Sequence, residues 1–372
     1  MKEKQTNTKN PIVIAASQFA KGNKDYLNPE DFSTWSFSTG SLTLDLAMRG
    51  GIHSGVTVLG GASKGGKTSS LLEFVSRALE TGENYAIYYD AEGRVTKEML
   101  DRVKFKYCLE EEDWGPGICL FKWPKNHEFV LNQMLNVIET NKELPKSERK
   151  RFIFVVDSVD ALVEKADEEK AAGELNKMAS TASILSRFFA KSNMVLNKLG
   201  HCACFVKQVR EKIKGNYDKA KPNESIEVGG GHSLTHYANY ILEFKGRTKN
   251  KKIIEGGKVI GHKCTIDLKK SQKCDINVEV IYPVKYIDGE KGEGRVWMEY
   301  EIYELLLVWG FLEKKGAWLN FDEASLLELE AIYPNIREEK FQGANKFVAF
   351  LEENNDITKF FYEKFTNLLS DN

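Results

Sequence analysis

The chain has 372 residues, of which 42% are hydrophobic and 29% are charged, and its formal net charge is −1. Domains commonly hold about 100–200 residues, so this length suggests two domains or one large core with appendages. The composition excludes an intrinsically disordered chain, and only 29 Gly and 8 Pro exclude a collagen-like one. Taken alone, the near-neutral charge argues against a uniformly basic nucleic-acid-binding protein.

The polar start and the cysteines bear on where the protein resides. Met1–Asn10 is polar and no apolar run approaches about 18 residues, so we expect neither a signal peptide nor a transmembrane span. None of the six cysteines forms a C-x-x-C pair, which argues against a zinc ribbon or a redox motif. We therefore expect a cytoplasmic protein without a membrane partner.

From Ser36 to about Pro283, short β-type runs alternate with longer helical segments, after a polar head in which Pro11–Ala20 is one predicted helix. This alternation predicts an α/β fold with a mostly parallel central sheet flanked by helices. The predicted buried strands are Val56–Leu59, Tyr85–Tyr89, Phe152–Val156, Cys202–Val206 and Tyr240–Phe244. The predicted helices include Thr68–Glu80 and Lys177–Leu199, and Lys263–Leu268 and Asn277–Tyr282 are expected to extend the sheet.

The character of the sequence changes after the turn cluster Lys285–Gly294. Tyr300–Phe311 and Asn345–Leu369 carry apolar residues at helical spacing. We therefore predict a small, mostly helical C-terminal unit.

The segment Gly61–Thr68 matches the phosphate-binding pattern G-x-x-x-x-G-K-S/T, between a β-type run and a helical run as that motif requires. Its glycines would let backbone N–H groups and a helix N-terminus converge on phosphate oxygens. Lys67 is expected to reach the β and γ phosphates, and Thr68 to ligate Mg²⁺. The predicted ATP-binding residues are Gly61, Ala62, Ser63, Lys64, Gly65, Gly66, Lys67, Thr68 and Ser69.

Three further polar side chains follow predicted strands, and parallel strands bring such positions to one edge of a sheet. Asp157 ends the run Phe152–Val156 and is the predicted Mg²⁺-binding acid. Glu92 is a candidate for orienting or deprotonating an attacking water. Gln208 is a candidate sensor of the γ phosphate. For Asp157 the alternative is a carboxylate that only caps the next loop, and for Glu92 and Gln208 it is an ordinary polar residue at a strand end.

Short motifs over about residues 36–320 resemble those of the RecA family in order and approximate spacing. They are Ser38–Ala47 with Gly50-Gly51-Ile52, the phosphate-binding loop, Asp90-Ala91-Glu92, Val155–Val159, Gln208-Val209-Arg210, Gly230-Gly231 with Tyr237-Ala238, and Gly316-Ala317-Trp318. Lys207 departs from the pattern, since the family has Asn before that Gln. Phage recombinases of the UvsX type share the same plan, so the resemblance covers host and phage-encoded proteins of the bacterial cytoplasm.

The resemblance implies a RecA-like P-loop NTPase core at residues 36–286, an N-terminal oligomerisation arm at 1–35 and a small acidic C-terminal domain at 287–372. It gives Glu92 the catalytic carboxylate role, Asp157 and Thr68 the Mg²⁺ role, and Gln208 the nucleotide-sensing role. The adenine side departs from the family, because Thr96 and Met99 stand where RecA has Asp and Tyr; Met99 could still pack on a base.

In RecA the ATP lies between protomers, and a K-x-K segment of the neighbour reaches the phosphates. The matching stretch here is Lys269-Lys270-Ser271-Gln272. Lys270 fits the first position, whereas Gln272 replaces the second lysine. The resemblance therefore implies Lys270 as a catalytic residue acting in trans, with Lys269 or Lys273 as substitutes.

The resemblance places DNA-binding loops near 163–177 and 208–229. Lys207–Lys221 has a net charge of +4 and contains Tyr217, which suits a single-strand contact through charge and base stacking. The first loop carries Asp167-Glu168-Glu169 and is less suited to phosphate. The expected DNA-binding residues are Arg187, Arg210, Lys212, Lys214, Tyr217, Lys219, Gly230 and Gly231. For a loop of this charge, a solvated surface segment is the alternative.

The implied function is a DNA-dependent ATPase that forms a helical filament on single-stranded DNA and pairs it with homologous duplex DNA, using ATP and Mg²⁺. Two alternatives stay open. One is a hexameric motor of the DnaB or RadA helicase kind, which would need a dedicated N-terminal domain. The other is a non-catalytic regulatory paralogue, which the missing second lysine favours and the intact Lys67, Glu92 and Asp157 oppose.

The near-neutral net charge is the sum of a basic part and an acidic part of the chain. Residues 299–372 hold 15 acidic and 7 basic residues, a net −8, which leaves a net +7 on residues 1–298. The core can therefore attract phosphate while the C-terminal unit repels it. On this basis, deleting residues 295–372 is expected to strengthen DNA binding.

Overall fold

The computed structural model describes residues 33–61, 63–168, 179–208, 232–246, 251–273, 276–286 and 294–367. The predicted helix at Pro11–Ala20, most of the predicted N-terminal arm, and most of both expected DNA loops lie outside these residues. Within the described part of the chain, no helix combines the length and the apolar character needed to cross a membrane.

The described residues build one eleven-stranded sheet, the major part of which is parallel, as predicted. Its parallel strands, in spatial order, are β5 (Tyr107–Cys108), β6 (Cys119–Lys122), β4 (Asn84–Asp90), β7 (Arg151–Asp157), β8 (Cys202–Val206), β3 (Gly55–Gly61) and β9 (Tyr240–Phe244). Antiparallel strands continue the sheet beyond β9, namely β11 (Lys258–Lys270), β12 (Val278–Tyr286) and β13 (Gly294–Val296), with β10 (Lys252–Glu255) also paired to β11. The short strands β1 (Ser36–Phe37) and β2 (Ile52–His53) form a separate pair.

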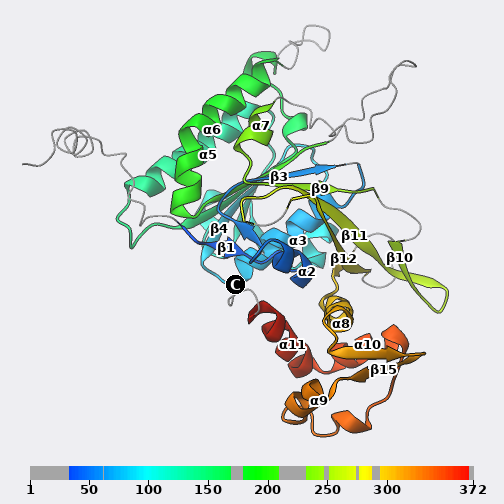
Figure 1. The fold of residues 1–372 in the computed structure, drawn as a ribbon. Helices are drawn as coiled ribbons and strands as arrows, with labels where there is room; N and C mark the ends of the chain where they lie inside the picture. The colour runs from blue at the N-terminus through cyan, green and yellow to red at the C-terminus, as the bar shows by residue number, and fades with distance from the viewer. Residues whose placement is uncertain are drawn as a thin grey trace, which may run out of the picture.

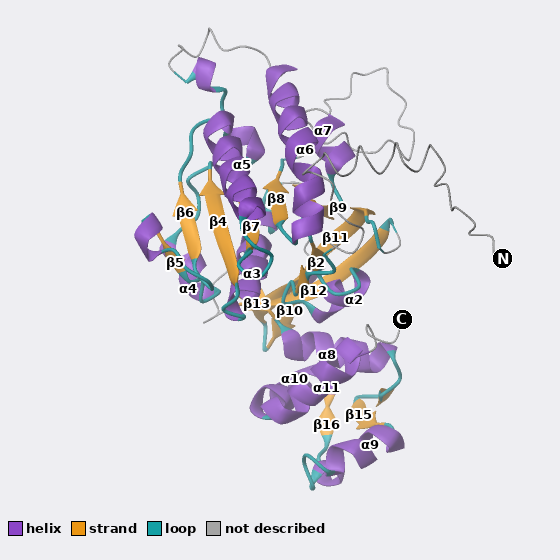
Figure 2. Cartoon of the chain, turned by 90° about the vertical axis from the view of Figure 1, so that its left-hand side faces the viewer, coloured by secondary structure: helices purple, strands orange, loops and turns teal. Residues whose placement is uncertain are grey.

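Helices cover both faces of the sheet, as Figure 1 shows. The face carrying α3 (Lys67–Glu80) also lies near the short helices α2 (Leu42–Ala47) and α4 (Lys97–Arg102). The opposite face is covered by α5 (His127–Glu143), α6 (Ala179–Leu199) and α7 (His232–Tyr237), which lie together in front of the strands in Figure 2.

The alternation of side chains along each strand divides the core between these faces. On β7, Ile153 and Val155 pack in the cluster that contains α3, whereas Phe152 and Phe154 pack in the cluster that contains α5 and α6. Successive strand residues point to opposite faces, so a strand buried on both sides is a continuous apolar run. This is why the sequence predicted these central strands correctly.

The C-terminal unit has a hydrophobic cluster of its own, formed mainly by residues after Trp297. As predicted, this unit is mostly helical, and it also contains a short three-stranded antiparallel sheet. The predicted helical run Asn345–Leu369 is divided, since one helix ends at Glu353 and the next begins at Asn355. The elements are α8 (Met298–Val308), β14 (Leu312–Lys315), β15 (Trp318–Phe321), α9 (Glu323–Glu330), β16 (Phe341–Gln342), α10 (Gly343–Glu353) and α11 (Asn355–Asn367).

One buried carboxyl group joins this unit to the core. Glu301, on α8, accepts hydrogen bonds from Ser41 Oγ at 2.5 Å and from the backbone N–H of Leu42 at 2.9 Å, at the start of α2. Helix N-termini carry unpaired N–H groups and favour an acceptor. Burial nevertheless raises the pKa of Glu301 to about 8, against the opposing effect of these hydrogen bonds.

Candidate nucleotide-binding site

The loop between β3 and α3 has the backbone conformation that the phosphate-binding motif needs. Gly66 precedes the first helical residue with φ of 101°, a left-handed conformation that L side chains rarely adopt. Gly61 has φ of 131°, and a Cβ atom there would lie 2.2 Å from the carbonyl oxygen of Phe244. Side chains at these two positions would distort the loop. Ala62, between them, lies outside the described residues.

Lys67 begins α3 and is only 8% exposed. Its Nζ donates a hydrogen bond to the carbonyl oxygen of Gly61 at 2.9 Å, across the mouth of the loop. Burial lowers the pKa of Lys67, while the carboxylates of Asp157, Glu92 and Asp160 oppose that shift. A cation among nearby acids is thus already in place where the motif predicts the phosphates.

The loop opens onto a cavity of about 290 Å³. This volume is near the lower end of small-molecule pockets, which span about 300–1,000 Å³. The cavity contains most of the residues that the sequence predicted for nucleotide and Mg²⁺, together with Arg94 and Val206. It is lined by Ser63, Lys64, Gly65, Gly66, Lys67, Thr68, Ser69, Glu92, Arg94, Asp157, Val206 and Gln208.

Asp157 ends β7 inside this cavity and is held by a tyrosine from the neighbouring strand. The Tyr88 hydroxyl donates a hydrogen bond to Asp157 Oδ2 at 2.8 Å. Burial raises the pKa of Asp157, and hydrogen bonds from Tyr88 and Thr68 act in the opposite direction. A carboxylate and a threonine hydroxyl are the oxygen donors that Mg²⁺ prefers, so the side chains present fit that ion.

Both carboxylate oxygens of Glu92 have partners within the cavity. Oε1 accepts hydrogen bonds from Ser158 Oγ at 2.7 Å and Gln208 Nε2 at 2.8 Å. Oε2 forms an ion pair with Arg94 at 2.8 Å. Asp90 has a different role, because its carboxylate accepts the backbone N–H groups of Arg94 and Val95. Of the two acids in this motif, only Glu92 lines the cavity.

Gln208 follows β8 and is anchored at both its side chain and its backbone. Its side-chain amide reaches Glu92, and its backbone N–H donates to Asp160 Oδ2 at 2.9 Å. The described residues end here and resume at residue 232. The structure thus places the predicted sensor between the nucleotide cavity and the start of the second expected DNA loop.

The two residues predicted on the adenine side do not line the cavity. Thr96 is the N-cap of α4 and accepts a hydrogen bond from the Met99 backbone N–H at 3.4 Å. Met99 packs against the core cluster on the α3 side. Their contact with a base remains a prediction, and the local fold accounts for both without it.

The lysines expected to act in trans have partners within their own chain. Lys270 Nζ donates to the carbonyl oxygens of Thr235 and His236, both at 2.9 Å, near the C-terminal end of α7. Lys269 pairs with Asp267 at 3.0 Å, and Lys273 Nζ lies 3.1 Å from His53 Nδ1. A trans role would require Lys270 to exchange these carbonyls for phosphate.

Of the expected DNA-binding residues, the structure describes only Arg187. It is exposed on α6, where its Nε donates a hydrogen bond to the carbonyl oxygen of Ser183 at 3.4 Å. The others lie outside the described residues, namely Arg210, Lys212, Lys214, Tyr217, Lys219, Gly230 and Gly231.

Five residues of the site were not predicted from the sequence, namely Tyr88, Arg94, Ser158, Asp160 and Val206. Arg94 and Ser158 closely flank predicted residues and could have been included by proximity. Tyr88 stands in the middle of an apolar strand, where packing is the usual role of a tyrosine. The position of Asp160 depends on how the chain turns after β7, which spacing alone does not show.

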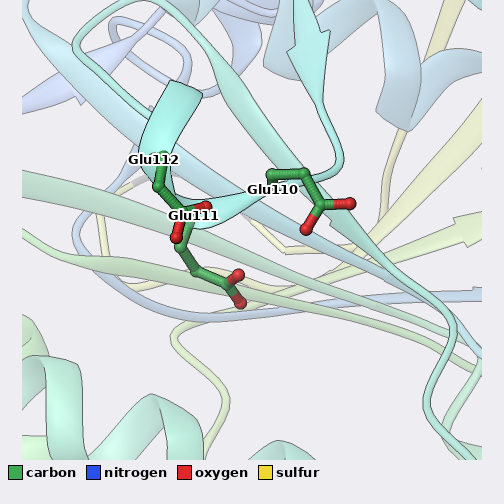
Figure 3. A group of neighbouring side chains, drawn as sticks. All are labelled: Glu110, Glu111 and Glu112. Carbon is green, nitrogen blue, oxygen red and sulfur yellow. The ribbon is translucent and has the colours of Figure 1, made fainter.

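Three neighbouring acidic residues lie outside the cavity and do not indicate a metal site. Figure 3 shows the neighbouring side chains of Glu110, Glu111 and Glu112. One carboxylate oxygen of each lies within 4.8 Å of the others, and all three residues are exposed. Glu111 pairs with Lys122 at 2.7 Å. Exposed acidic groups of this kind are common on protein surfaces without any ion.

Comparisons with known proteins agree with this geometry. A family model described as the RecA N-terminal domain matches residues 124–289. Protein RecA of Citrifermentans bemidjiense is 27% identical over 357 residues, covering 94% of this chain and 91% of that protein. Protein RecA of Rhodopseudomonas palustris is 27% identical over 346 residues, covering 92% and 85%.

The chain is similar to RecA proteins over most of its length. Protein RecA of Geobacter sulfurreducens, 27% identical over 288 residues and covering 76% of this chain and 75% of its own length, adds a third relative. This distant similarity supports a recombinase-like function, with ATP binding and DNA recombination at the level of the family. It also confirms the RecA-like α/β core that the sequence motifs predicted.

Proposed function

We propose that this RecA-family protein is a DNA-dependent ATPase that assembles on single-stranded DNA and promotes homologous pairing and strand exchange in DNA recombination and repair. The observation that carries the proposal is the bond between Gln208 and Glu92 inside the phosphate-binding cavity. It connects the residue suited to activating water with the residue that begins a basic segment.

The residues present fit ATP and Mg²⁺. The loop at 61–68 would hold the phosphates through its backbone N–H groups, the start of α3 and the Lys67 ammonium. Thr68 and Asp157 would hold the ion, which would neutralise charge on the phosphate oxygens. Lys67 Nζ donates to the Gly61 carbonyl in the described conformation, and it would stay hydrogen-bonded on exchanging that oxygen for a phosphate oxygen. The nearby acids favour its charged form.

Glu92 would orient the attacking water and accept its proton. In the described conformation two donors occupy Oε1 and Arg94 pairs with Oε2, so three of about four acceptor positions of the carboxylate are taken. Release of Gln208 would free a position on Oε1. The proposed role of Gln208 is therefore double, since it blocks the carboxylate in one conformation and senses the γ phosphate in the other.

The segment after Gln208 would carry this change to DNA. Its lysines and Tyr217 suit phosphate and base contacts along a single strand. Protomers would assemble head to tail through the N-terminal segment at 1–35, and such heterologous contacts build filaments. Lys270 of one protomer would reach the cavity of the next.

One observation favours a second candidate, a regulatory RecA-family member without turnover. Lys269, Lys270 and Lys273 each have partners within their own chain, and Gln272 replaces the second lysine of the family segment. Such a protein would bind nucleotide and partners without completing the site between protomers.

Electron microscopy of the protein with single-stranded DNA and a non-hydrolysable ATP analogue tests the proposal. Continuous helical filaments that need both ligands are expected. Rings would favour a hexameric motor, and dispersed particles would favour the regulatory candidate. Lys67→Ala serves as the control, because it removes the phosphate-binding cation and should give no nucleotide-dependent filaments.

A further inference from the structure

Lys207 is a fully buried lysine that the mechanism above does not use. Its side chain is 0% exposed, and within the described part of the chain its Nζ has no hydrogen-bond partner. Removing an ammonium group from water without a partner costs several kcal/mol. A residue held in so unfavourable a position needs an explanation, and this one stands where the RecA motif has Asn.

The pleat of β8 places Lys207 on the face away from the nucleotide. Val206 lines the nucleotide cavity, whereas Phe205 packs in the cluster formed with α5 and α6. The Lys207 N–H continues the pairing with β3 by donating to Leu59 O at 2.9 Å. Because side chains alternate along a strand, Lys207 points to the same face of the sheet as Phe205, and Gln208 points to the same face as Val206. Neighbouring residues thus face the two sides of the sheet.

Asp160 is the charged group that connects these two residues. Its Oδ2 accepts the backbone N–H of Gln208 at 2.9 Å. Burial lowers the pKa of Lys207, and the negative charge of Asp160 opposes that shift. Burial also lowers the pKa of Lys67, at the phosphate-binding loop, and the negative charge of Asp160 is one of those that oppose this shift. Asp160 therefore lies within electrostatic reach of both the nucleotide cavity and the buried lysine.

We propose that Lys207 and Asp160 form a switch pair that couples nucleotide binding to the conformation of the segment after Gln208. In the described conformation Asp160 accepts the Gln208 N–H, and Lys207 Nζ has no hydrogen-bond partner among the residues that the structure describes. When Gln208 moves toward the nucleotide, its N–H leaves Asp160 Oδ2, and that oxygen becomes the partner of Lys207. Formation of this ion pair offsets the loss of the two bonds of Gln208. Lys207 is a positioning residue, and the inference rests on the proposed function.

Two conservative variants test the pair, namely Lys207→Met, which keeps most of the volume, and Asp160→Asn, which keeps an acceptor for the Gln208 N–H. Binding to a fluorescently labelled oligo-dT is measured by anisotropy at a saturating concentration of a non-hydrolysable ATP analogue. Each single variant is expected to lose affinity about tenfold, and the double variant no further, because both changes remove the same interaction. Lys191→Met, which removes an exposed charge on α6, is the control and should stay within about twofold.

Thermal unfolding without nucleotide separates a switch from a structural role. Lys207→Met should unfold at the wild-type temperature or above, since it removes a buried ammonium that has no hydrogen-bond partner within the described residues. A lower unfolding temperature together with weaker DNA binding would assign Lys207 to stability alone. Unchanged DNA affinity in either single variant, or independent losses that multiply in the double variant, would also overturn the proposal. If the wild-type protein itself binds oligo-dT equally well with and without the analogue, the proposed function fails instead.

Discussion

Gln208 Nε2 lies 2.8 Å from Glu92 Oε1, so side chains that follow β8 and β4 meet across the end of β7. Gln208→Ala removes this link and the proposed sensor. We expect ATP-analogue affinity to stay within about twofold and stimulation of hydrolysis by single-stranded DNA to disappear. Arg94→Ala, which frees the other oxygen of Glu92, should keep the stimulation. Normal stimulation of Gln208→Ala would show that the DNA signal reaches Glu92 by another route.

Tyr88 is expected to position Asp157 for Mg²⁺. Tyr88→Phe keeps the ring and removes one donor to a buried carboxylate, a loss of about 1 kcal/mol in a typical hydrogen bond. The Mg²⁺ concentration for half-maximal binding of a fluorescent ATP analogue should change by about fivefold. Tyr89→Phe is the matched control, because its hydroxyl contacts Gln133 on the opposite face. Equal Mg²⁺ dependence in both variants would remove Tyr88 from the site.

Glu301 predicts a pH dependence of stability. Its folded-state pKa of about 8 lies above the ordinary value of 4.5, so the folded protein holds the additional proton between these values. The free energy of unfolding should therefore fall as pH rises from about 4.5 to 8, by at most about 1.4 kcal/mol per pH unit from this group. Thermal unfolding across this range should show a shallower fall in Glu301→Gln than in wild type.

Glu304→Gln, on the same helix, provides the comparison, because Glu304 is half-buried and pairs with Lys263. Identical slopes for Glu301→Gln and wild type would exclude Glu301 as the titrating group. The contact of Glu301 with Ser41 and Leu42 also bears on the C-terminal truncation that the charge distribution suggested, because that truncation would remove Glu301. Deleting residues 295–372 removes the acceptor for Ser41 and Leu42, and it uncovers the buried side chain of Leu42.

The sequence predicted the parts of the fold that depend on local patterns. The apolar strands, α3 and the loop at 61–68 each have a signal within about ten residues, and they lie where expected. The three short strands of the C-terminal unit were missed, because two to four residues are too few to show an alternation. The break at Asn354 was missed because the apolar spacing continues on both sides.

The site divides in the same way. Lys67, Glu92, Asp157 and Gln208 were found as a group because strand ends of a parallel sheet converge. Tyr88 and Asp160, which donate to or accept from these residues, lie on a neighbouring strand and after a turn. Their roles depend on side-chain direction, which residue spacing does not determine.

The basic segment after Gln208 is expected to hold the DNA backbone. Replacing Lys212, Lys214 and Lys219 with Ala should weaken single-strand binding and reduce the slope of log affinity against log salt by about 2, at about 0.7 for each phosphate that a lysine no longer neutralises. The same replacement of the exposed Lys314, Lys340 and Lys346 is the control for net charge. An equal effect in both triple variants would assign binding to overall charge, and an unchanged slope in the first would place the DNA site elsewhere.

The central claim is that single-stranded DNA stimulates ATP hydrolysis through Glu92. Its most direct test is steady-state hydrolysis by wild type and Glu92→Gln, with and without oligo-dT, alongside ATP-analogue binding. Wild type should be stimulated by DNA, and Glu92→Gln should bind the analogue within about twofold of wild type while hydrolysing at least about 100-fold more slowly. DNA-stimulated turnover by Glu92→Gln at the wild-type rate would contradict the account.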